Sequence, residues 1–219
     1  MPRLKICGIT RLEDAILAAE HRADYVGLIF TPASPRCLEP AKARAIADAV
    51  RGRVALVGVF MDQDPAFIER VAQTVGLDLI QLHGEEDRSL IEKLPVPVIK
   101  TTFYGPGSGE PRDTEKAAYT LLDRHRDASS SVRRDPDPDA LARALADLAA
   151  ERKCFIAGGI TPDNLPGILD RVDSYFPFAI DVSSGVESET GIKCPFKIER
   201  LNRMLDTNKN RAREVSHAS

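Results

Sequence analysis

The sequence predicts an α/β protein, a single (β/α)8 TIM barrel in which the region after the fifth strand is irregular or shortened. The first reason is that short apolar, β-branched runs alternate along the chain with segments of helical period. The second is that most of these runs are almost continuously hydrophobic, as parallel strands buried on both faces are. The third is that no GxGxxG turn follows the first run, although an open doubly wound sheet, the alternative fold, usually has one there.

Seven apolar runs are expected to be strands of the barrel. They are Leu4–Cys7, Tyr25–Phe30, Ala55–Phe60, Leu79–His83, Val98–Thr102, Cys154–Ala157 and Phe178–Val182. The runs that start at Val98 and Cys154 lie 56 residues apart, much farther than other neighbours, which indicates a hidden strand between them. Ala118–Leu122 is the best candidate and would complete the eight strands of a closed barrel. The segment from Asp113 to Asp127 fits one helix as well, because short apolar runs are ambiguous.

Helix start and stop signals lie between these runs. A polar cap followed by a proline, or by a glutamate three residues on, is typical of a helix start, and a glycine is typical of a helix end. These signals are the capping-box pair Thr10 and Glu13, the cap–proline pairs Glu39-Pro40, Asp64-Pro65 and Thr161-Pro162, and the C-terminal Gly76. They place a helix after most of the predicted strands.

The composition is that of an ordinary globular protein, with 43% hydrophobic residues and 30 basic against 33 acidic side chains. This near balance of charge makes no case for a nucleic-acid partner. No apolar run is long enough to span a bilayer, and the first ten residues lack the apolar stretch of a signal peptide. We therefore expect a cytoplasmic protein with neither nucleic acid nor membrane as a partner. The four cysteines form no CxxC pair, so no metal site is expected.

The chain of 219 residues fits one domain of this fold. We expect the catalytic barrel to span residues 1–207. Residues 208–219 are polar with almost no apolar side chains, and we expect them to form a disordered C-terminal tail. Residues 128–138 are expected to form an exposed loop for the same reason.

Two candidate catalytic residues lie at strand ends, where functional groups of such barrels collect. Cys7 ends the first strand, and a thiol before a helix N-terminus can have a lowered pKa and act as a base or nucleophile. A buried, inert cysteine is the alternative. Asp123 ends the hidden strand and can serve as a general acid if burial raises its pKa. In the helical alternative for this segment, Asp123 is a surface carboxylate.

A phosphate site is predicted by glycines and serines after the last two strands. Gly158 and Gly159 follow one strand, and Ser183, Ser184 and Gly185 follow the next. Glycines let backbone N–H groups approach a phosphate closely, and the serine hydroxyls add donors. Loops at these positions commonly hold phosphate in barrel enzymes. Two ordinary tight turns are the alternative.

Three further residues are candidate substrate-binding groups. Arg36 can offer a bidentate fork to a substrate carboxylate, although a surface ion pair is as good an interpretation. His83, at a strand end, fits a positioning or ligand-facing role better than a catalytic one, because no nucleophile pattern accompanies it. Asp181 can orient backbone groups or substrate hydroxyls, or it can cap the serine-rich turn.

Together these motifs resemble the phosphoribosylanthranilate isomerase family of tryptophan biosynthesis. The resemblance covers about residues 3–102 and 153–204, and the pairing of a KICGIT start with a DVSSGVE end is highly specific. The motifs that carry it are Lys5–Thr10, Gly27–Phe30, Ser34–Arg36, Val57–Phe60, Gln81–Gly84, Ala157–Asn164, Asp181–Glu187 and Gly191–Lys193.

The resemblance implies a barrel enzyme that needs no metal or cofactor. Its reaction would be the Amadori rearrangement of N-(5′-phosphoribosyl)anthranilate to 1-(2-carboxyphenylamino)-1-deoxyribulose 5-phosphate. By position, Cys7 would be the general base at the ribose C2′ atom and Asp123 the general acid at the ring oxygen. Arg36 would bind the anthranilate carboxylate. Gly159 and the turn Ser183–Gly185 would hold the phosphate. The partner is thus a small phosphoribosyl substrate, and the chain can be a monomer or a homodimer.

The sequence departs from this family in the middle. No GGTG loop follows Asp123, and Asp127 is the fallback for the acid if the register differs. Cys194 stands where an acidic residue commonly precedes the proline. The altered segment 103–138 motivates a second hypothesis, a phosphate-binding barrel of the same family with impaired turnover that acts as a ligand-binding or interaction protein. A third is another sugar-phosphate enzyme on this fold, such as an epimerase or the related histidine-pathway isomerase, which would carry an aspartate in place of Cys7.

Overall fold

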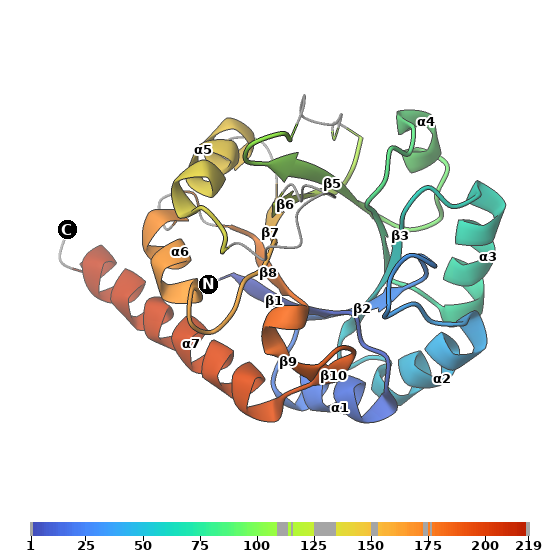
Figure 1. The fold of residues 1–219 in the computed structure, drawn as a ribbon, viewed down its shortest axis with the longest axis horizontal. Helices are drawn as coiled ribbons and strands as arrows, with labels where there is room; N and C mark the ends of the chain where they lie inside the picture. Colours follow the sequence, from blue (N-terminus) through green and yellow to red (C-terminus); the bar gives the residue numbers. More distant parts are fainter. Residues whose placement is uncertain are drawn as a thin grey trace.

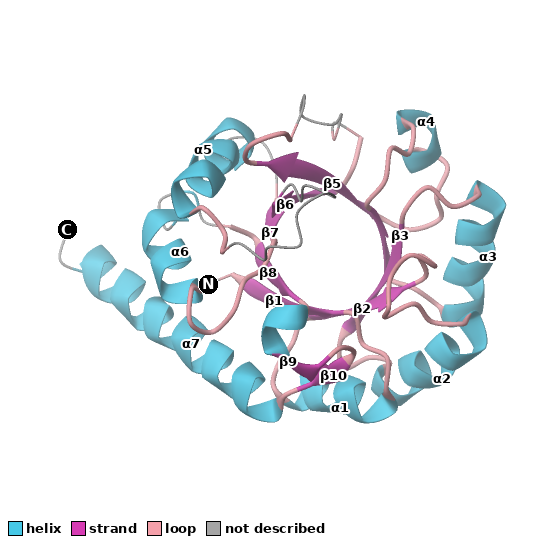
Figure 2. Ribbon diagram, viewed as in Figure 1, coloured by secondary structure: helices cyan, strands magenta, loops and turns pink. Residues whose placement is uncertain are grey.

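Eight parallel strands form a closed barrel in chain order, surrounded by helices (Figures 1 and 2). The computed structural model describes residues 2–108, 114, 116–124, 135–149, 153–172, 175 and 177–217. The strands are β1 (Arg3–Cys7), β2 (Tyr25–Ile29), β3 (Ala55–Phe60), β4 (Leu79–Leu82), β5 (Val98–Tyr104), β6 (Tyr119–Arg124), β7 (Cys154–Ile156) and β8 (Ala179–Val182). The barrel closes where β8 pairs with β1, with Lys5 opposite Asp181. The predicted TIM barrel is therefore confirmed.

The hidden strand predicted at Ala118–Leu122 is present. It is β6, which begins one residue later and runs on to Arg124. It pairs in parallel with β5, from Ile99 opposite Tyr119 to Tyr104 opposite Arg124, and its other edge pairs with β7. The alternative of one helix over this segment is wrong. The adjacent residues Leu121 and Leu122 point to opposite faces of a strand, and both faces are buried.

The helices lie outside the barrel, and the helical layer is thin beside β5 (Figure 2). They are α1 (Leu12–Glu20), α2 (Pro40–Val50), α3 (Pro65–Val75), α4 (Arg88–Ile91), α5 (Pro138–Ala149), α6 (Leu165–Val172) and α7 (Pro195–His217). Helix α4 has only four residues. Between β5 and β6, the described residues 105–108, 114 and 116–118 contain no helix. The region after the fifth strand is irregular, as predicted.

Helix α3 is bounded by the two signals that the sequence shows. The Asp64 side chain accepts hydrogen bonds from the backbone N–H groups of Ala66 and Phe67, and a proline occupies the first turn. Gly76 ends the helix with a φ of 70°, which a residue with a side chain rarely adopts. Helix α2 likewise begins at the predicted Pro40, although no side-chain cap precedes it.

One predicted helix start is wrong. Helix α1 begins at Leu12 without a side-chain cap, and the Thr10 hydroxyl instead donates to the carbonyl oxygen of Gly191. This tertiary contact replaces the local cap.

The predicted cap at Thr161 is present. Its hydroxyl accepts hydrogen bonds from the backbone N–H groups of Asp163 and Asn164, and its carbonyl oxygen accepts one from Leu165, where the regular helix α6 starts.

The barrel interior has an apolar cluster and a buried polar group. The apolar cluster consists of Tyr25, Val57, Leu79, Ile99, Leu121, Phe155, Ala157 and Ala179. Lys5 is fully buried and donates to Gln81 on β4 and to Asp181 on β8. Since β4 and β8 lie on opposite sides of an eight-stranded barrel, a lysine that reaches both must point into its interior. Larger apolar contacts fill the space between the strands and the outer helices.

The backbone of α7 continues as a helix to His217. It crosses the boundary at residue 207, where a disordered tail was expected, so the chain does not leave helical structure at that residue. The last two residues lie outside the described part of the chain, and the division into barrel and tail stays a prediction. Among the described residues, every helix is too short or too polar to cross a membrane.

Candidate active site

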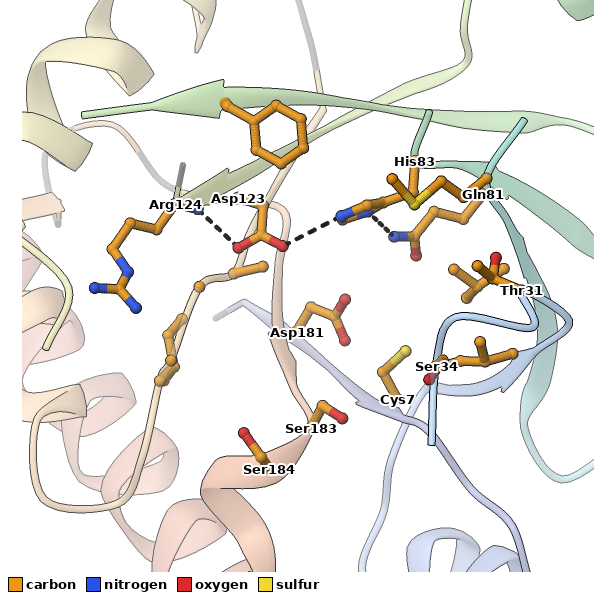
Figure 3. A pocket seen from close by; sticks show the side chains of 18 of the residues that line it. Cys7, Thr31, Ser34, Gln81, His83, Asp123, Arg124, Asp181, Ser183 and Ser184 are labelled. Atoms are coloured by element: carbon orange, nitrogen blue, oxygen red, sulfur yellow. Dashed lines mark hydrogen bonds and ion pairs between the residues drawn. The ribbon is translucent and has the colours of Figure 1, made fainter. Parts of the chain in front are cut away.

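A cavity of about 700 Å³ opens at the C-terminal ends of the strands (Figure 3). All the site residues predicted from the sequence line it except Arg36. These lining residues are Cys7, His83, Asp123, Gly158, Gly159, Asp181, Ser183, Ser184 and Gly185. Asp127, the fallback for the acid, lies outside the described residues. The cavity has the size and position expected for a small-molecule site in this fold.

Cys7 ends β1 with its thiol in the cavity wall. Its side chain packs on Gly27 of the neighbouring strand, where an added Cβ atom would come within 2.7 Å of the sulfur. The sequence predicts a lowered pKa from a helix N-terminus, and this prediction is wrong. The nearest helix, α1, starts at Leu12, and burial raises the pKa of the Cys7 thiol, although the positive charges of Lys5 and Lys193 oppose this effect.

Asp123 lies one residue before the end of β6, with its carboxyl group at the cavity. Its Oδ1 atom accepts a hydrogen bond of 2.7 Å from the backbone N–H of Arg124, and Oδ2 lies 3.7 Å from Nε2 of His83. Gly158 has a φ of 99°, and a Cβ atom there would come within 2.9 Å of Oδ1. A glycine at this position therefore leaves room for the carboxyl group. Figure 3 shows Asp181 between Asp123 and Cys7.

His83 follows β4 and is held beside Asp123. Its Nδ1 atom lies 3.2 Å from the Thr101 hydroxyl and 3.4 Å from the Gln81 side-chain amide. Its ring meets Phe103 edge to face. These contacts hold the ring with Nε2 toward the carboxyl group, and the positioning role of His83 stays a prediction.

The two predicted phosphate loops contact each other. The loop after β7 contains Gly158 and Gly159, both with positive φ, and the loop after β8 forms a short 3-10 helix, η2 (Ser184–Val186). A Cβ atom on Gly185 would overlap the carbonyl oxygen of Ile160, so the loops pack backbone to backbone. Asn164 also ties the first loop together, since its amide donates to the carbonyl oxygen of Gly159. The result is a wall of backbone groups at one end of the cavity.

Arg36 lies beside the cavity and pairs with a carboxylate of the protein itself. Its Nε and Nη2 atoms donate to the two oxygens of Glu187, at 2.7 and 2.5 Å. Nη1 makes no hydrogen bond to a described residue. Glu187 begins β9 (Glu187–Glu189), which pairs with β10 (Ile192–Lys193). The ion pair that the sequence analysis weighed for Arg36 is thus present, although it is mostly buried rather than on the surface.

Lys193 connects this ion pair to the end of β1 and to the loop after β8; the sequence names it only as the last residue of a family motif and not as a site residue. The buried Nζ atom donates to Glu187, to the carbonyl oxygen of Cys7 and to that of Ser183. The single carboxylate of Glu187 therefore pairs with two cations. Arg36 and Lys193 overcome the cost of burial and lower the pKa of Glu187 to about 2.

Glu187→Gln is expected to lower stability at neutral pH and to flatten its dependence on acid. The ordinary pKa of 4.5 applies to the unfolded chain and a pKa of about 2 to the folded one, so the unfolded chain binds the extra proton between these values. The ionised group stabilises the fold above pH 4.5, by at most about 3 kcal/mol, and this contribution disappears as the pH falls toward 2. Urea unfolding at pH 7 and pH 3 measures this difference. Glu13→Gln, at a side chain 71% exposed, is the matched control, and equal acid sensitivity of both variants would contradict the expectation.

Comparison with known proteins identifies close relatives. A family model described as "N-(5'phosphoribosyl)anthranilate (PRA) isomerase" matches residues 4–203. An N-(5′-phosphoribosyl)anthranilate isomerase of Halorhodospira halophila is 38% identical over 205 residues, which are 91% of this chain and 94% of the relative.

Two solved structures are similar over nearly the whole chain. The phosphoribosyl anthranilate isomerase of Thermus thermophilus has a TM-score of 0.79 and 39% identity, and the match covers 94% of this chain and 98% of that one. A second isomerase, solved in complex with reduced 1-(o-carboxyphenylamino)-1-deoxyribulose 5-phosphate, has a TM-score of 0.78 and 35% identity, with coverage of 94% and 100%.

Proposed function

Since the chain belongs to the N-(5′-phosphoribosyl)anthranilate isomerase family, we propose that it performs this Amadori rearrangement with Cys7 as general base and Asp123 as general acid. The observation that carries the proposal is that one cavity brings together the thiol, the carboxyl group and both phosphate loops. These groups come from β1, β6, β7 and β8, so only the folded barrel assembles them. The product analogue bound by one relative has the three chemical parts that such a cavity must hold: a carboxyphenyl group, a sugar chain and a phosphate.

Asp123 serves the first step, the opening of the ribose ring. Its carboxyl group donates a proton to the ring oxygen as the bond from C1′ to that oxygen breaks, and the lone pair of the anthranilate nitrogen forms the C=N bond. The donor must lie within about 2.6–3.2 Å of the oxygen. The hydrogen bond from the Arg124 N–H and the nearby His83 ring hold the carboxyl group at the cavity for this transfer.

Cys7 serves the second step, the removal of the C2′ proton. The thiolate takes this proton and becomes a thiol, while the electrons of the C–H bond form a C1′=C2′ double bond and neutralise the iminium nitrogen. Addition of a proton to C1′ and loss of the proton from the C2′ hydroxyl then give the ketone product. Because burial raises the pKa of the thiol, we expect kcat/KM to rise with pH through the neutral range as the thiolate fraction grows.

The two ends of the substrate are held by groups on either side of these catalytic residues. The backbone N–H groups near Gly159 and in η2, with the Ser183 and Ser184 hydroxyls, suit a phosphate. The Nη1 group of Arg36 suits the anthranilate carboxylate, because Glu187 occupies only the other two nitrogens. Fixing both ends places the sugar between the thiol and the carboxyl group. The cytoplasmic location and the choice between monomer and homodimer stay predictions.

The experiment that tests this function follows the fluorescence of the anthranilate group, which is expected to fall as purified protein converts the substrate. A protein that binds the reduced product analogue but leaves the fluorescence unchanged would overturn the proposal. That outcome would favour the second hypothesis, a barrel that binds ligand without turnover.

Gly185→Ala is expected to weaken substrate binding by its effect on the phosphate loops. The added methyl group must push η2 away from Ile160 and so displace the donors that face the phosphate. Loss of one hydrogen bond to a charged group costs about 1.5–3 kcal/mol, which corresponds to a KM about 10 to 100 times higher. The measurement is KM together with the melting temperature. Gly167→Ala is the control, because a Cβ atom there meets nothing within 4 Å; an equal KM for both variants would reject this phosphate site.

A further inference from the structure

Lys5 is a fully buried lysine that the mechanism above leaves without a role. Its Nζ atom donates to Asp181 Oδ2 at 2.7 Å and to Gln81 Oε1 at 2.9 Å. A buried ammonium group is costly, and removal of its partner is strongly destabilising, so such a group is retained only where its surroundings compensate the charge. The barrel interior can be filled by apolar side chains, as its lower part is. A buried charge directly below the cavity is therefore not needed to fill the barrel interior, which points to a functional role.

The geometry connects Lys5 to the thiol. Lys5 and Cys7 lie two residues apart on β1, so both side chains point to the same face of the strand, which is the barrel interior. An ammonium group has three N–H donors, and the two bonds to Asp181 and Gln81 occupy two of them. This placement brings the ammonium group near the sulfur, where the charge of each group favours the charged form of the other and so raises the pKa of Lys5 and opposes the rise in the pKa of Cys7.

We propose that Lys5 is a positioning residue whose ammonium group stabilises the thiolate form of Cys7, and that Asp181 and Gln81 hold it in place for this task. The proposal rests on the role of Cys7 as general base. When the thiolate takes the C2′ proton, its negative charge disappears, and the lysine remains paired with Asp181. The ammonium group thus stays compensated in both states of the base.

Other charged groups also face the thiol of Cys7. Some of them favour its neutral form and others favour the thiolate. Asp181 on β8 favours the neutral thiol, while Lys193 on β10 favours the thiolate and donates to the carbonyl oxygen of Cys7 itself. Arg36, from the loop after β2, interacts with the thiolate as well. Desolvation is the largest influence and raises the pKa of Cys7. Lys5 is the largest of the influences that oppose it, which makes this lysine the position to test.

Asp181 has two roles in this arrangement. Its Oδ2 atom fixes the ammonium group, while Oδ1 is buried, lines the cavity and has no hydrogen-bond partner among the described residues. At the Cys7 sulfur, the negative charge of Asp181 partly cancels the effect of the positive charge of Lys5. Removal of Lys5 must therefore raise the pKa of the Cys7 thiol, whereas removal of the charge of Asp181 must lower it. General damage to the fold would not produce this pair of opposite effects.

The test is the pH dependence of the alkylation of Cys7 by iodoacetamide, followed by mass spectrometry, in a Cys37→Ser, Cys194→Ser background. Lys5→Met is expected to move the midpoint for Cys7 upward by about 1–3 pH units, because it removes a close opposite charge. Asp181→Asn is expected to move it downward. Lys100→Met is the matched control, since this other buried lysine pairs with Glu86 and Gly84 instead, and its variant is expected to leave the midpoint unchanged.

The proposal is overturned if Lys5→Met leaves the midpoint in place or lowers it, or if both variants move it in the same direction. Should Lys5→Met not fold, an unchanged or raised midpoint in Asp181→Asn overturns it. The alkylation needs no substrate, so it is independent of the proposed reaction. If the alkylation midpoints shift as expected but Cys7→Ala keeps full turnover, only the reaction mechanism is rejected. If the midpoints do not shift but Cys7→Ala is inactive, only the role of Lys5 is rejected.

Discussion

Cys7→Ala is expected to lower kcat by about 10²–10⁴-fold, the usual contribution of a general base. The substitution removes the only thiol among the described residues that line the cavity, and a methyl group cannot accept the C2′ proton. Affinity for the reduced product analogue is expected to stay near the wild-type value, because Arg36 and the phosphate loops are unchanged. Steady-state kinetics with the fluorescent substrate, together with calorimetric titration of the analogue, measures both quantities.

The control for this variant is Cys37→Ser, at an exposed cysteine one residue from Arg36. Its kcat is expected to match that of the wild type. A Cys7→Ala protein that turns over at the wild-type rate would show that another group removes the proton. A protein that loses affinity for the analogue as strongly as it loses kcat would instead assign Cys7 to binding.

Asp123→Asn is expected to lower kcat by a similar factor, about 10²–10⁴-fold, because an amide cannot donate a proton to the ring oxygen as an acid does. Asparagine keeps the size of the side chain, and its Oδ1 atom can still accept the hydrogen bond from the Arg124 N–H. The geometry of the cavity is therefore expected to persist, with binding of the product analogue little changed. The same pair of measurements separates the loss of turnover from a loss of binding.

Asp206→Asn is the control, because this carboxylate pairs with Arg22, which precedes β2 at the opposite end of the barrel. Wild-type turnover by Asp123→Asn would contradict the assignment of the acid. Asp127→Asn would then be the next variant to test, since the sequence leaves this aspartate as the alternative.

The strand pattern was readable in the sequence because each strand of this barrel is short, apolar and separated from the next by polar turns. Even β6 could be located, since a closed barrel requires a strand in the gap between Val98 and Cys154. The start of α1 could not be predicted from local signals, because the Thr10 side chain contacts Gly191, far away in the sequence, instead of capping the helix. The cap at Thr161 was predictable, since it uses only residues of its own turn.

The predicted cavity residues could be found for a related reason: each lies at or just after the C-terminal end of a strand, and these strand ends meet at one end of a barrel. The charged residues that support these cavity residues could not be predicted from the sequence. Lys5 interrupts an apolar strand and finds its partners across the barrel, while Lys193 lies in a two-residue strand and finds its partners on β1, on β9 and in the loop after β8. The raised pKa of Cys7 was likewise hidden, because burial depends on the packing of Gly27 and other neighbouring side chains rather than on the residues adjacent in sequence.

The most direct test of the account is a crystal structure of this protein with reduced 1-(o-carboxyphenylamino)-1-deoxyribulose 5-phosphate. The account predicts the phosphate against Gly159 and η2, with the Cys7 sulfur about 3–3.5 Å from the C2′ atom. It also predicts the Asp123 carboxyl group on the far side of the sugar chain, within about 3 Å of the oxygen that closes the ring in the substrate. A sugar chain bound with C2′ away from the sulfur, or with no acidic group at that oxygen, would contradict the mechanism.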